Sequence, residues 1–350
     1  EGVLVANCEI YNWKELQQTY ALPARNDAEL LLAFLDAFGM EKIEELDGVF
    51  AFAYYQDGQL FLVRDILGEK PLWYAFEKGC LAFASEKKVL QQLGYRIVQE
   101  LNPRTILCYD EQQETLTETR REFFVAQSEH FDTYEILREK TKQLLDEAIK
   151  KRIPWQKFGL LFSGGVDSTY LAKYFKEQRY EFTCYTTVLD GEQDAPDFLA
   201  AQQVAAELGL SLRVQKIQLA DLPHYLRTVV PLIEDSHVVK VGVALTFFGA
   251  CELAKEDGCK VIFSGLGSEE IFAGYERHKQ AADVNRECLS GLLKIYERDL
   301  YRDDVITMSN HLELRLPFLD RGLVAYALRI PGQYKLRENC TKYILRDIAQ

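Results

Sequence analysis

The pattern of apolar and polar residues divides the chain into two parts. Up to about residue 110, short apolar or alternating runs predict strands over 2–11, 48–55, 59–63, 72–76, 81–84 and 105–109. Asp57-Gly58, between two of these runs, is typical of a hairpin turn. A helix is predicted over 27–38, because its apolar residues share one face and Asn26 or Asp27 can cap it. This part therefore predicts an α+β domain rich in antiparallel sheet.

The second part begins after a largely polar stretch, 114–130, which we interpret as a linker. Beyond residue 134, strands alternate with helices of about ten residues or more, a pattern typical of a parallel α/β sheet. The predicted strands are 158–162, 182–188, 212–217 and 259–263, and the predicted helices are 167–178, 195–208 and 243–255. The predicted organisation is a first domain over 1–118, a linker over 119–133 and a second domain over 134–350.

Composition narrows the function classes. The 350 residues carry a net charge of −13, which disfavours nucleic acid and anionic membranes as partners. The eight cysteines lack C-x-x-C spacing, so we expect reduced thiols, no structural metal and a cytoplasmic location. No apolar run approaches the roughly 20 residues of a membrane span. The chain begins at Glu1 directly with an apolar run, and we expect it to be a fragment of a longer protein.

The segment Ser163-Gly164-Gly165-Val166-Asp167-Ser168 joins a predicted strand to a predicted helix. Two glycines permit close backbone approach, and the helix start exposes unpaired N–H groups, so the segment predicts a phosphate site. It lacks the lysine of a P-loop and the spacing of a dinucleotide fingerprint. The alternative is an ordinary capped turn between a strand and a helix.

Several motifs in collinear order carry a family resemblance. The segment 163–168 resembles the SGG-x-DS signature of the PP-loop ATP pyrophosphatases. Residues 264–275, 308–320 and 342–346 are similar to the SG-x-G, E-x-R-x-PFLD and K-x-x-L-R segments of asparagine synthetases. In the first domain, 7–12, 26–29, 46–52, 64–72 and 83–86 resemble motifs of class II glutamine amidotransferases. The resemblance covers nearly the whole chain.

This resemblance implies an Ntn-type αββα domain, incomplete at its start, followed by a PP-loop α/β domain. It implies a ligase that uses ATP and Mg²⁺ to activate a carboxylate, with aspartate expected, and that takes ammonia from glutamine. The implied nucleotide-binding residues are Phe162, Ser163, Gly164, Gly165, Asp167, Ser168, Ser264 and Gly265. Asp167 and Glu269 would bind the metal, Lys342 would stabilise charge on the adenylate, and Asn7 would donate to an oxyanion. Glu9 and Asp27 would bind glutamine.

Some positions depart from the family pattern. Glu269 stands where the family has Asp, and Leu266 stands where well-known members have Glu. The nearby basic residue Arg277 is a candidate for binding the anionic substrate, with a helix C-terminus that favours cations as the alternative. The catalytic N-terminal Cys of the amidotransferases is absent from the sequence. Cys8 occupies a glycine position of the motif, and we interpret it as a packing residue and not as a nucleophile.

These departures leave alternatives open. One is an adenylating synthetase that uses an internal amine, as β-lactam synthetases do, although the retained Asn7, Glu9 and Asp27 favour a glutamine site. Another is a non-catalytic protein with a decayed site. The sequence does not fix the carboxylate substrate, and it is compatible with a homodimer.

Overall fold

The structure of the chain, a computed structural model, describes residues 2–125, 128–191, 195–338 and 340–350. The chain forms two compact units. The first comprises Glu1–Phe123 and Ile295–Tyr301, and the second comprises Phe124–Lys294 and Arg302–Gln350. The sequence pattern did not indicate that a short segment near residue 300 groups with the first unit. Residues 126–127 of the predicted linker lie outside the described residues.

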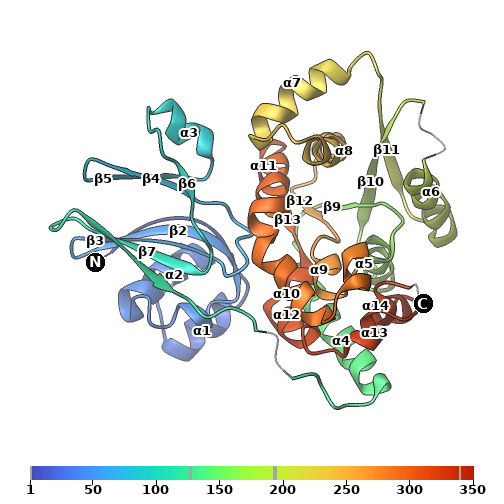
Figure 1. Ribbon diagram of the computed structural model, residues 1–350, viewed down its shortest axis with the longest axis horizontal. Coiled ribbons are helices and arrows are strands. Elements are labelled where there is room, and N and C mark those ends of the chain that lie inside the picture. Colours follow the sequence, from blue (N-terminus) through green and yellow to red (C-terminus); the bar gives the residue numbers. More distant parts are fainter. Residues whose placement is uncertain (1, 126–127, 192–194, 339) are drawn as a thin grey trace. The chain divides into compact units, whose positions relative to one another are not determined.

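The first unit contains two antiparallel sheets, with strand orders β1-β2-β3-β7-β8 and β5-β4-β6 (Figure 1). Its strands are β1 (Val3–Ile10), β2 (Gly48–Gln56), β3 (Gln59–Arg64), β4 (Trp73–Glu77), β5 (Cys80–Ala84), β6 (Gln99–Glu100), β7 (Thr105–Asp110) and β8 (Thr115–Arg120). Its helices are α1 (Trp13–Tyr20), α2 (Asp27–Phe38) and α3 (Lys87–Gln92), with a 3-10 turn at Ile43–Glu45 and a π-helical segment at Tyr296–Leu300.

Strand β2 shows how alternation builds the core of this unit. Phe50 and Phe52 join a cluster that includes Leu31 and Phe34 of α2, whereas Ala51 and Ala53 join a cluster that includes Tyr74 of β4. Successive side chains point to opposite faces of a strand, so β2 packs against helices on one face and the small sheet on the other.

Two local predictions for this unit, the helix over 27–38 and the hairpin turn at Asp57-Gly58, are confirmed. Helix α2 has the predicted bounds, and the Asn26 side chain caps it by accepting a hydrogen bond from the Glu29 N–H at 2.8 Å. Asp57 and Gly58 have φ angles of 51° and 82°, as a two-residue hairpin turn requires.

The interpretation of 114–130 as linker is wrong at its start. Thr115–Arg120 forms β8, which pairs with β7 at the edge of the larger sheet. Most of its side chains are exposed, so the strand carries no apolar alternation that sequence reasoning could detect. The boundary predicted at residue 118 falls inside this strand.

The second unit contains one parallel sheet with strand order β11-β10-β9-β12-β13 (Figure 1). Its strands are β9 (Phe158–Leu161), β10 (Phe182–Leu189), β11 (Leu212–Ile217), β12 (Val261–Phe263) and β13 (Glu313–Arg315). The helices that precede β12 in the sequence are α4 (Tyr134–Lys150), α5 (Val166–Glu177), α6 (Pro196–Leu208), α7 (Leu222–Ile233) and α8 (Val238–Glu256). Beyond β12 they are α9 (Ser268–Ile271), α10 (Val284–Ile295), α11 (Tyr301–Ser309), α12 (Arg321–Ala327), α13 (Gly332–Lys335) and α14 (Tyr343–Ile348), with 3-10 turns at Glu276–Gln280 and Pro317–Leu319.

The order of these strands locates a crevice. The chain runs from β9 outward through β10 to β11 and then returns to place β12 on the other side of β9. Connections after β9 and β12 therefore leave the sheet in opposite directions, and such a switch point opens a crevice at the carboxyl ends of the two strands. The two glycine-containing loops predicted from the sequence follow these two strands.

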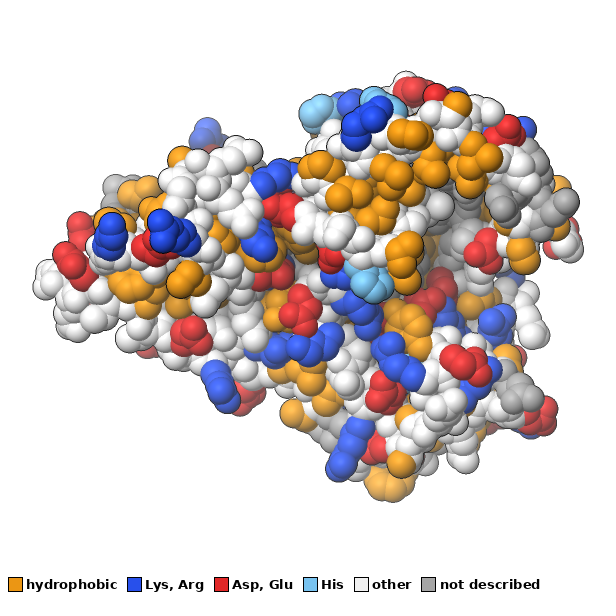
Figure 2. Space-filling view, turned by 45° about the horizontal axis from the view of Figure 1, so that its top comes forward, with side chains coloured by type: hydrophobic (Ala, Val, Ile, Leu, Met, Phe, Trp, Pro, Cys, Tyr) orange, Lys and Arg blue, Asp and Glu red, His pale blue; other side chains and the backbone are white. Residues whose placement is uncertain are grey.

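Helix α8 carries exposed apolar side chains, among them Val238, Val239 and Val243. Figure 2 shows apolar side chains gathered on one face of the second unit. Among the described residues, no single helix has the length and apolar composition to cross a membrane, and the pair α7 and α8 meets that test only together, across a bend of 108°.

Candidate active site

The first loop connects β9 to α5 and is shaped by Gly164. This residue has a φ of +73°, and a Cβ there would lie 2.5 Å from the Ala200 backbone carbon of α6. Only glycine combines this conformation with so close an approach. Within the loop, Ser168 Oγ donates to the Gly165 carbonyl at 3.2 Å, and the Gly165 N–H donates to Ser163 Oγ at 3.3 Å. The loop therefore presents hydroxyl and N–H groups at the start of a twelve-residue helix, which suits a phosphate.

The second loop connects β12 to α9 and packs directly on the first. A Cβ on Gly265 would lie 2.7 Å from the Asp167 Cβ, so this glycine lets the two loops touch. Gly267 has a φ of +97°, and the Leu266 N–H donates to Ser264 Oγ at 3.2 Å. The loops predicted from separate motifs thus form one surface at the switch point.

Lys342 joins the acidic residues of both loops. Its Nζ donates to Asp167 Oδ2 and Glu269 Oε1, each at 2.6 Å, and to Ser268 Oγ at 2.9 Å. The residue is 5% exposed and precedes α14. Burial raises the pKa of the Asp167 carboxyl, the Lys342 ammonium opposes this shift, and the Glu269 carboxylate adds to it. A lysine that contacts two carboxylates at this distance forms a strong charge-assisted network.

A cavity of about 440 Å³ opens beside the two loops. The predicted residues Phe162, Ser163, Asp167, Ser168, Ser264, Gly265 and Glu269 all contribute to its lining. Leu266 also lines it and makes this part of the wall apolar. The structure therefore brings most of the predicted nucleotide-site residues into one cavity.

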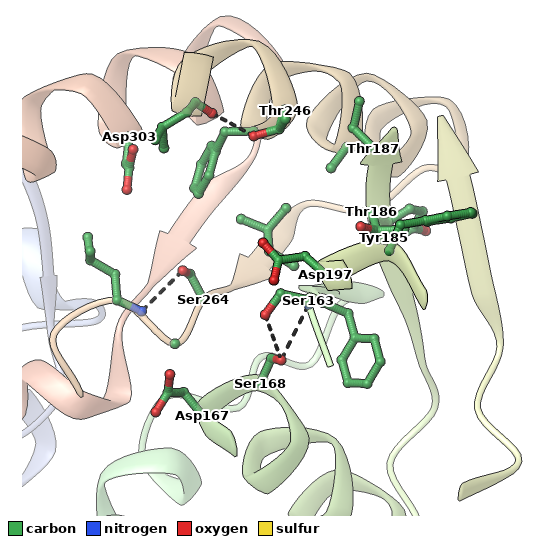
Figure 3. Close-up of a pocket in the computed structure, with 18 of the residues that line it drawn as sticks. Ser163, Asp167, Ser168, Tyr185, Thr186, Thr187, Asp197, Thr246, Ser264 and Asp303 are labelled. Carbon is green, nitrogen blue, oxygen red and sulfur yellow. Dashed lines mark hydrogen bonds between the residues drawn. The ribbon is translucent and has the colours of Figure 1, made fainter. Parts of the chain in front are cut away.

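Sequence reasoning missed other parts of the wall. Figure 3 shows Tyr185, Thr186 and Thr187 of β10 on one side of the cavity and Asp303 of α11 on the other. Within the described part of the chain, the buried Thr187 Oγ1 has no hydrogen-bond partner. Residues at the carboxyl end of the strand next to β9 could have been found by applying the switch-point rule to the predicted strand order.

Arg277 does not belong to the cavity lining that the structure describes. It lies in the 3-10 turn Glu276–Gln280, where its Nε contacts Glu287 Oε1 at 2.8 Å and its guanidinium lies 4.2 Å from the Tyr275 ring centroid. The alternative predicted from the sequence was a helix C-terminus. In the structure, Arg277 lies in this short 3-10 turn instead. The geometry gives no support to the substrate role expected for Arg277, because its charge is directed at other partners.

The segment 308–320 holds the sheet to α4. Arg152, which lies just after the end of α4, donates to Asp320 Oδ2 at 2.8 Å, and Lys151 also pairs with this carboxylate. The other oxygen, Asp320 Oδ1, accepts from the Gly322 and Leu323 N–H groups and caps α12. Arg315 donates to the Arg152 carbonyl. These contacts make the segment a structural support of the second unit.

The candidate residues of the first unit lie close together in the sequence. Asn7 and Glu9 lie two positions apart on the same face of β1. The Asp27 Oδ2 atom accepts a hydrogen bond from the Ile10 N–H at 3.1 Å. This bond ties the end of β1 to the start of α2. Cys8 lies on the opposite face and packs against the core cluster that includes Ile10 and Phe34, which agrees with a packing role.

The predicted metal ligands, Asp167 and Glu269, lie beside the phosphate loop. Asp167 Oδ1 is buried and has no hydrogen-bond partner among the described residues, and a carboxylate oxygen of this kind suits a hard cation. In the described ranges, no group of three or more His, Cys, Asp or Glu residues is placed to hold a metal alone. Two carboxylates beside a phosphate loop fit Mg²⁺, which commonly takes one or two carboxylates together with substrate phosphates.

Comparison with known proteins agrees with this geometry. A family model described as asparagine synthase matches residues 140–283 and 279–350, and one described as glutamine amidotransferase domain matches residues 1–140. The chain belongs to the asparagine synthetase family. The family predicted from the motifs is therefore confirmed, together with the fold class of an amidotransferase-like α+β domain and a PP-loop α/β domain.

Relatives extend over nearly the whole chain. It is 33% identical over 363 residues to a putative glutamine-hydrolysing asparagine synthetase of Methanocaldococcus jannaschii, covering 96% of this chain and 66% of the relative. It is 32% identical over 385 residues to the glutamine-hydrolysing asparagine synthetase of Mus musculus, covering 98% of this chain and 68% of the relative. The chain thus spans about two thirds of the length of these relatives. The roles of individual residues stay predictions.

Proposed function

We propose that this chain carries the catalytic machinery for ATP-dependent amidation of a carboxylate, with aspartate as the substrate and asparagine as the product. The observation that carries the proposal is the convergence of Asp167, Glu269 and Lys342 at the junction of two glycine loops. These residues come from three separate segments and line or adjoin one cavity. A cavity with a phosphate loop at one end and a buried lysine beside it suits activation of an acid by a nucleotide.

In the first step, a carboxylate oxygen of the substrate attacks the α-phosphorus of ATP. The bond from that phosphorus to the bridging oxygen breaks, and pyrophosphate leaves. The hydroxyl and N–H groups of Ser163, Gly165 and Ser168 bind the departing pyrophosphate through hydrogen bonds to its oxygens. Asp167 and Glu269 would hold a Mg²⁺ ion, which when bound supplies positive charge for the phosphates. The product of this step is an acyl-adenylate.

In the second step, ammonia attacks the acyl carbon and AMP leaves with its bonding electron pair. Negative charge develops on the acyl oxygen and on the phosphate as the tetrahedral intermediate forms and collapses. The Lys342 ammonium, buried beside the two loops, is the group that can stabilise this charge. One proton is released from nitrogen in the formation of the neutral amide.

The first unit would supply the ammonia. Asn7 would donate a hydrogen bond to the oxyanion formed during glutamine hydrolysis, and Glu9 and Asp27 would bind the amino-acid end of glutamine. Their placement on β1 and at the start of α2 within one local neighbourhood supports this assignment. Glutamine hydrolysis is thus proposed for the protein that contains this unit together with the family's catalytic cysteine.

The test follows an oxygen atom. Aspartate labelled with ¹⁸O in its side-chain carboxylate is incubated with the chain, ATP, Mg²⁺ and ammonium, and AMP is analysed by mass spectrometry. An acyl-adenylate pathway transfers one ¹⁸O to AMP, because the attacked acyl carbon loses the bond to that oxygen. Formation of ADP and phosphate, or AMP without label, would contradict the proposal.

A panel of carboxylates separates the alternatives. Leu266 makes part of the cavity wall apolar, so the panel includes larger acids with an internal amine as well as aspartate. Label transfer only from such an acid would favour a β-lactam synthetase-like reaction. No pyrophosphate release with any acid, from protein that still binds ATP, would favour a non-catalytic relative.

A further inference from the structure

The two carboxylates proposed for the metal are already engaged by a cation of the chain itself. Lys342 Nζ lies 2.6 Å from an oxygen of Asp167 and 2.6 Å from an oxygen of Glu269. The side chains of Lys342 and Asp167 are 7% and 16% exposed, so water screens this ion pair weakly. The Lys342 ammonium therefore lies between the two carboxylates that a divalent ion would need as ligands.

The fold is shaped to accept the lysine at this point. A Cβ on Gly274 would lie 2.3 Å from the Lys342 Cε and 2.9 Å from the Glu269 Cγ. Ser268, which is fully buried, accepts a third hydrogen bond from Nζ through its Oγ. Lys342 itself has a φ of 54°, a left-handed conformation that is uncommon for a residue with a side chain. Several features thus combine to place the ammonium between the carboxylates.

Electrostatics makes the ammonium and a divalent ion competitors. Two carboxylates carry a charge of −2, which one ammonium half neutralises and one divalent ion neutralises fully. Both cations in contact with the same two groups would repel each other strongly in a buried site. A new anionic partner for the lysine, such as a nucleotide phosphate, removes this conflict.

We infer that in the nucleotide-free protein Lys342 occupies the place of the divalent ion between Asp167 and Glu269, and that it moves to the phosphates when ATP binds with its metal. The inference rests on the proposed function, which assigns these carboxylates to Mg²⁺. It gives Lys342 a second role before its part in the reaction: it holds the two acidic loops together and keeps free divalent ions out. Metal binding then depends on nucleotide binding.

The test measures binding of Mn²⁺, used in place of Mg²⁺, to the nucleotide-free chain by the loss of the free-ion electron paramagnetic resonance signal. Lys342→Met is expected to bind Mn²⁺ about ten- to a hundredfold more tightly than the parent, the range over which groups contacting metal ligands alter affinity. Lys173→Met is the matched control. It removes the same charge from α5, where Lys173 donates to the Ala349 and Gln350 carbonyls, and it should leave Mn²⁺ affinity unchanged.

A double variant locates the ion. Adding Asp167→Asn to Lys342→Met should abolish the gain, which locates the ion at this site. The thermal midpoint of Lys342→Met should rise more with Mn²⁺ than that of the parent, because the ion neutralises two carboxylates left without their lysine.

The outcomes separate this inference from the proposed function. Equal Mn²⁺ affinity of the parent and Lys342→Met, with tight binding to both when a non-hydrolysable ATP analogue is present, overturns the inference and leaves the proposed function standing. Absence of Mn²⁺ binding to the parent even with the analogue, with no effect of Asp167→Asn, removes the metal site and therefore both proposals. A gain in Lys342→Met that Asp167→Asn cancels supports both.

Discussion

The two units assemble their candidate sites in different ways. In the second unit, the site depends on contacts between residues as far apart as Asp167 and Lys342, which are separated by 175 positions. In the first unit, Asn7 and Glu9 share one strand, and Asp27 is bonded to a backbone group only 17 positions away. The second site is therefore a product of tertiary structure, whereas the first rests on a strand and the start of a helix. Changes at the two sites should differ in size and kind.

The largest effect is expected from Asp167→Asn. This change removes a carboxylate from the junction of the two loops and should lower ATP-dependent pyrophosphate release by about a hundredfold or more, the size typical for loss of one preorganised charge-stabilising group. Far-ultraviolet circular dichroism should remain unchanged. Asp197→Asn is the control, because Asp197 lines the same cavity but is exposed, and it should alter the rate less than about threefold. Turnover by Asp167→Asn equal to that of the parent would exclude a catalytic role for the site.

The next largest effect is expected from the loss of the buried ion pair between Asp320 and Arg152 in the second unit. Asp320→Asn removes one partner of a buried ion pair with Arg152 and should destabilise this unit by about 3 kcal/mol in thermal or urea unfolding. Burial alone would raise the pKa of Asp320, but Arg152 and Lys151 together hold it below its usual value. The stabilisation is therefore complete above the unfolded pKa of about 4 and is lost as pH falls through the lower folded pKa. The difference between parent and variant should shrink below about pH 4, and a difference that persists there would refute this explanation.

A pair of glycine variants compares two neighbouring positions of the phosphate loop. Gly164→Ala forces a side chain into a left-handed conformation and against the α6 backbone, and it should cost about 2 kcal/mol of stability and weaken ATP binding. Gly165→Ala meets only Ser163 Oγ, at 3.3 Å, and should cost less than about 1 kcal/mol. Isothermal calorimetry with ATP and urea unfolding measure both. Equal effects of the two changes would show that the contact with α6 does not shape the loop.

A smaller effect is expected in the first unit. Asp27→Ala removes the acceptor for the Ile10 N–H and should destabilise this unit by about 1 kcal/mol, the typical value of one hydrogen bond. Pyrophosphate release with ammonium as the amine source should stay within twofold of the parent, about the scatter of a surface change. A large loss of that activity would mean that the two sites are coupled.

The smallest effect is expected for Arg277→Ala. Its guanidinium pairs with Glu287 at a partly exposed position, and such pairs contribute about 0–1 kcal/mol. Pyrophosphate release as a function of aspartate concentration should therefore match that of the parent. A selective rise in the aspartate KM would restore the substrate role that the sequence suggested for this residue.

Local patterns in the sequence determined much of the fold. The bounds of α2, the hairpin at Asp57-Gly58 and the parallel arrangement of the second unit follow from periodicity and turn chemistry that act within a few residues. Among the elements that escaped prediction, three have a clear physical reason. Strand β8 is polar because it is an exposed edge, β13 spans only three residues, and α7 contains Pro231, which normally argues against a helix.

The sequence also determined the chemistry of the candidate site, because Ser163-Gly164-Gly165 and the Lys342 segment contain residue types suited to phosphates and can be identified by motif. The contacts between these groups arise from tertiary structure. It brought Lys342 into contact with Asp167 and Glu269, opposed Gly274 to the lysine side chain, placed Thr187 in the cavity wall and paired Arg277 with Glu287 away from it. These contacts depend on the strand order of the sheet and on close packing between distant segments, which no local pattern of residues encodes.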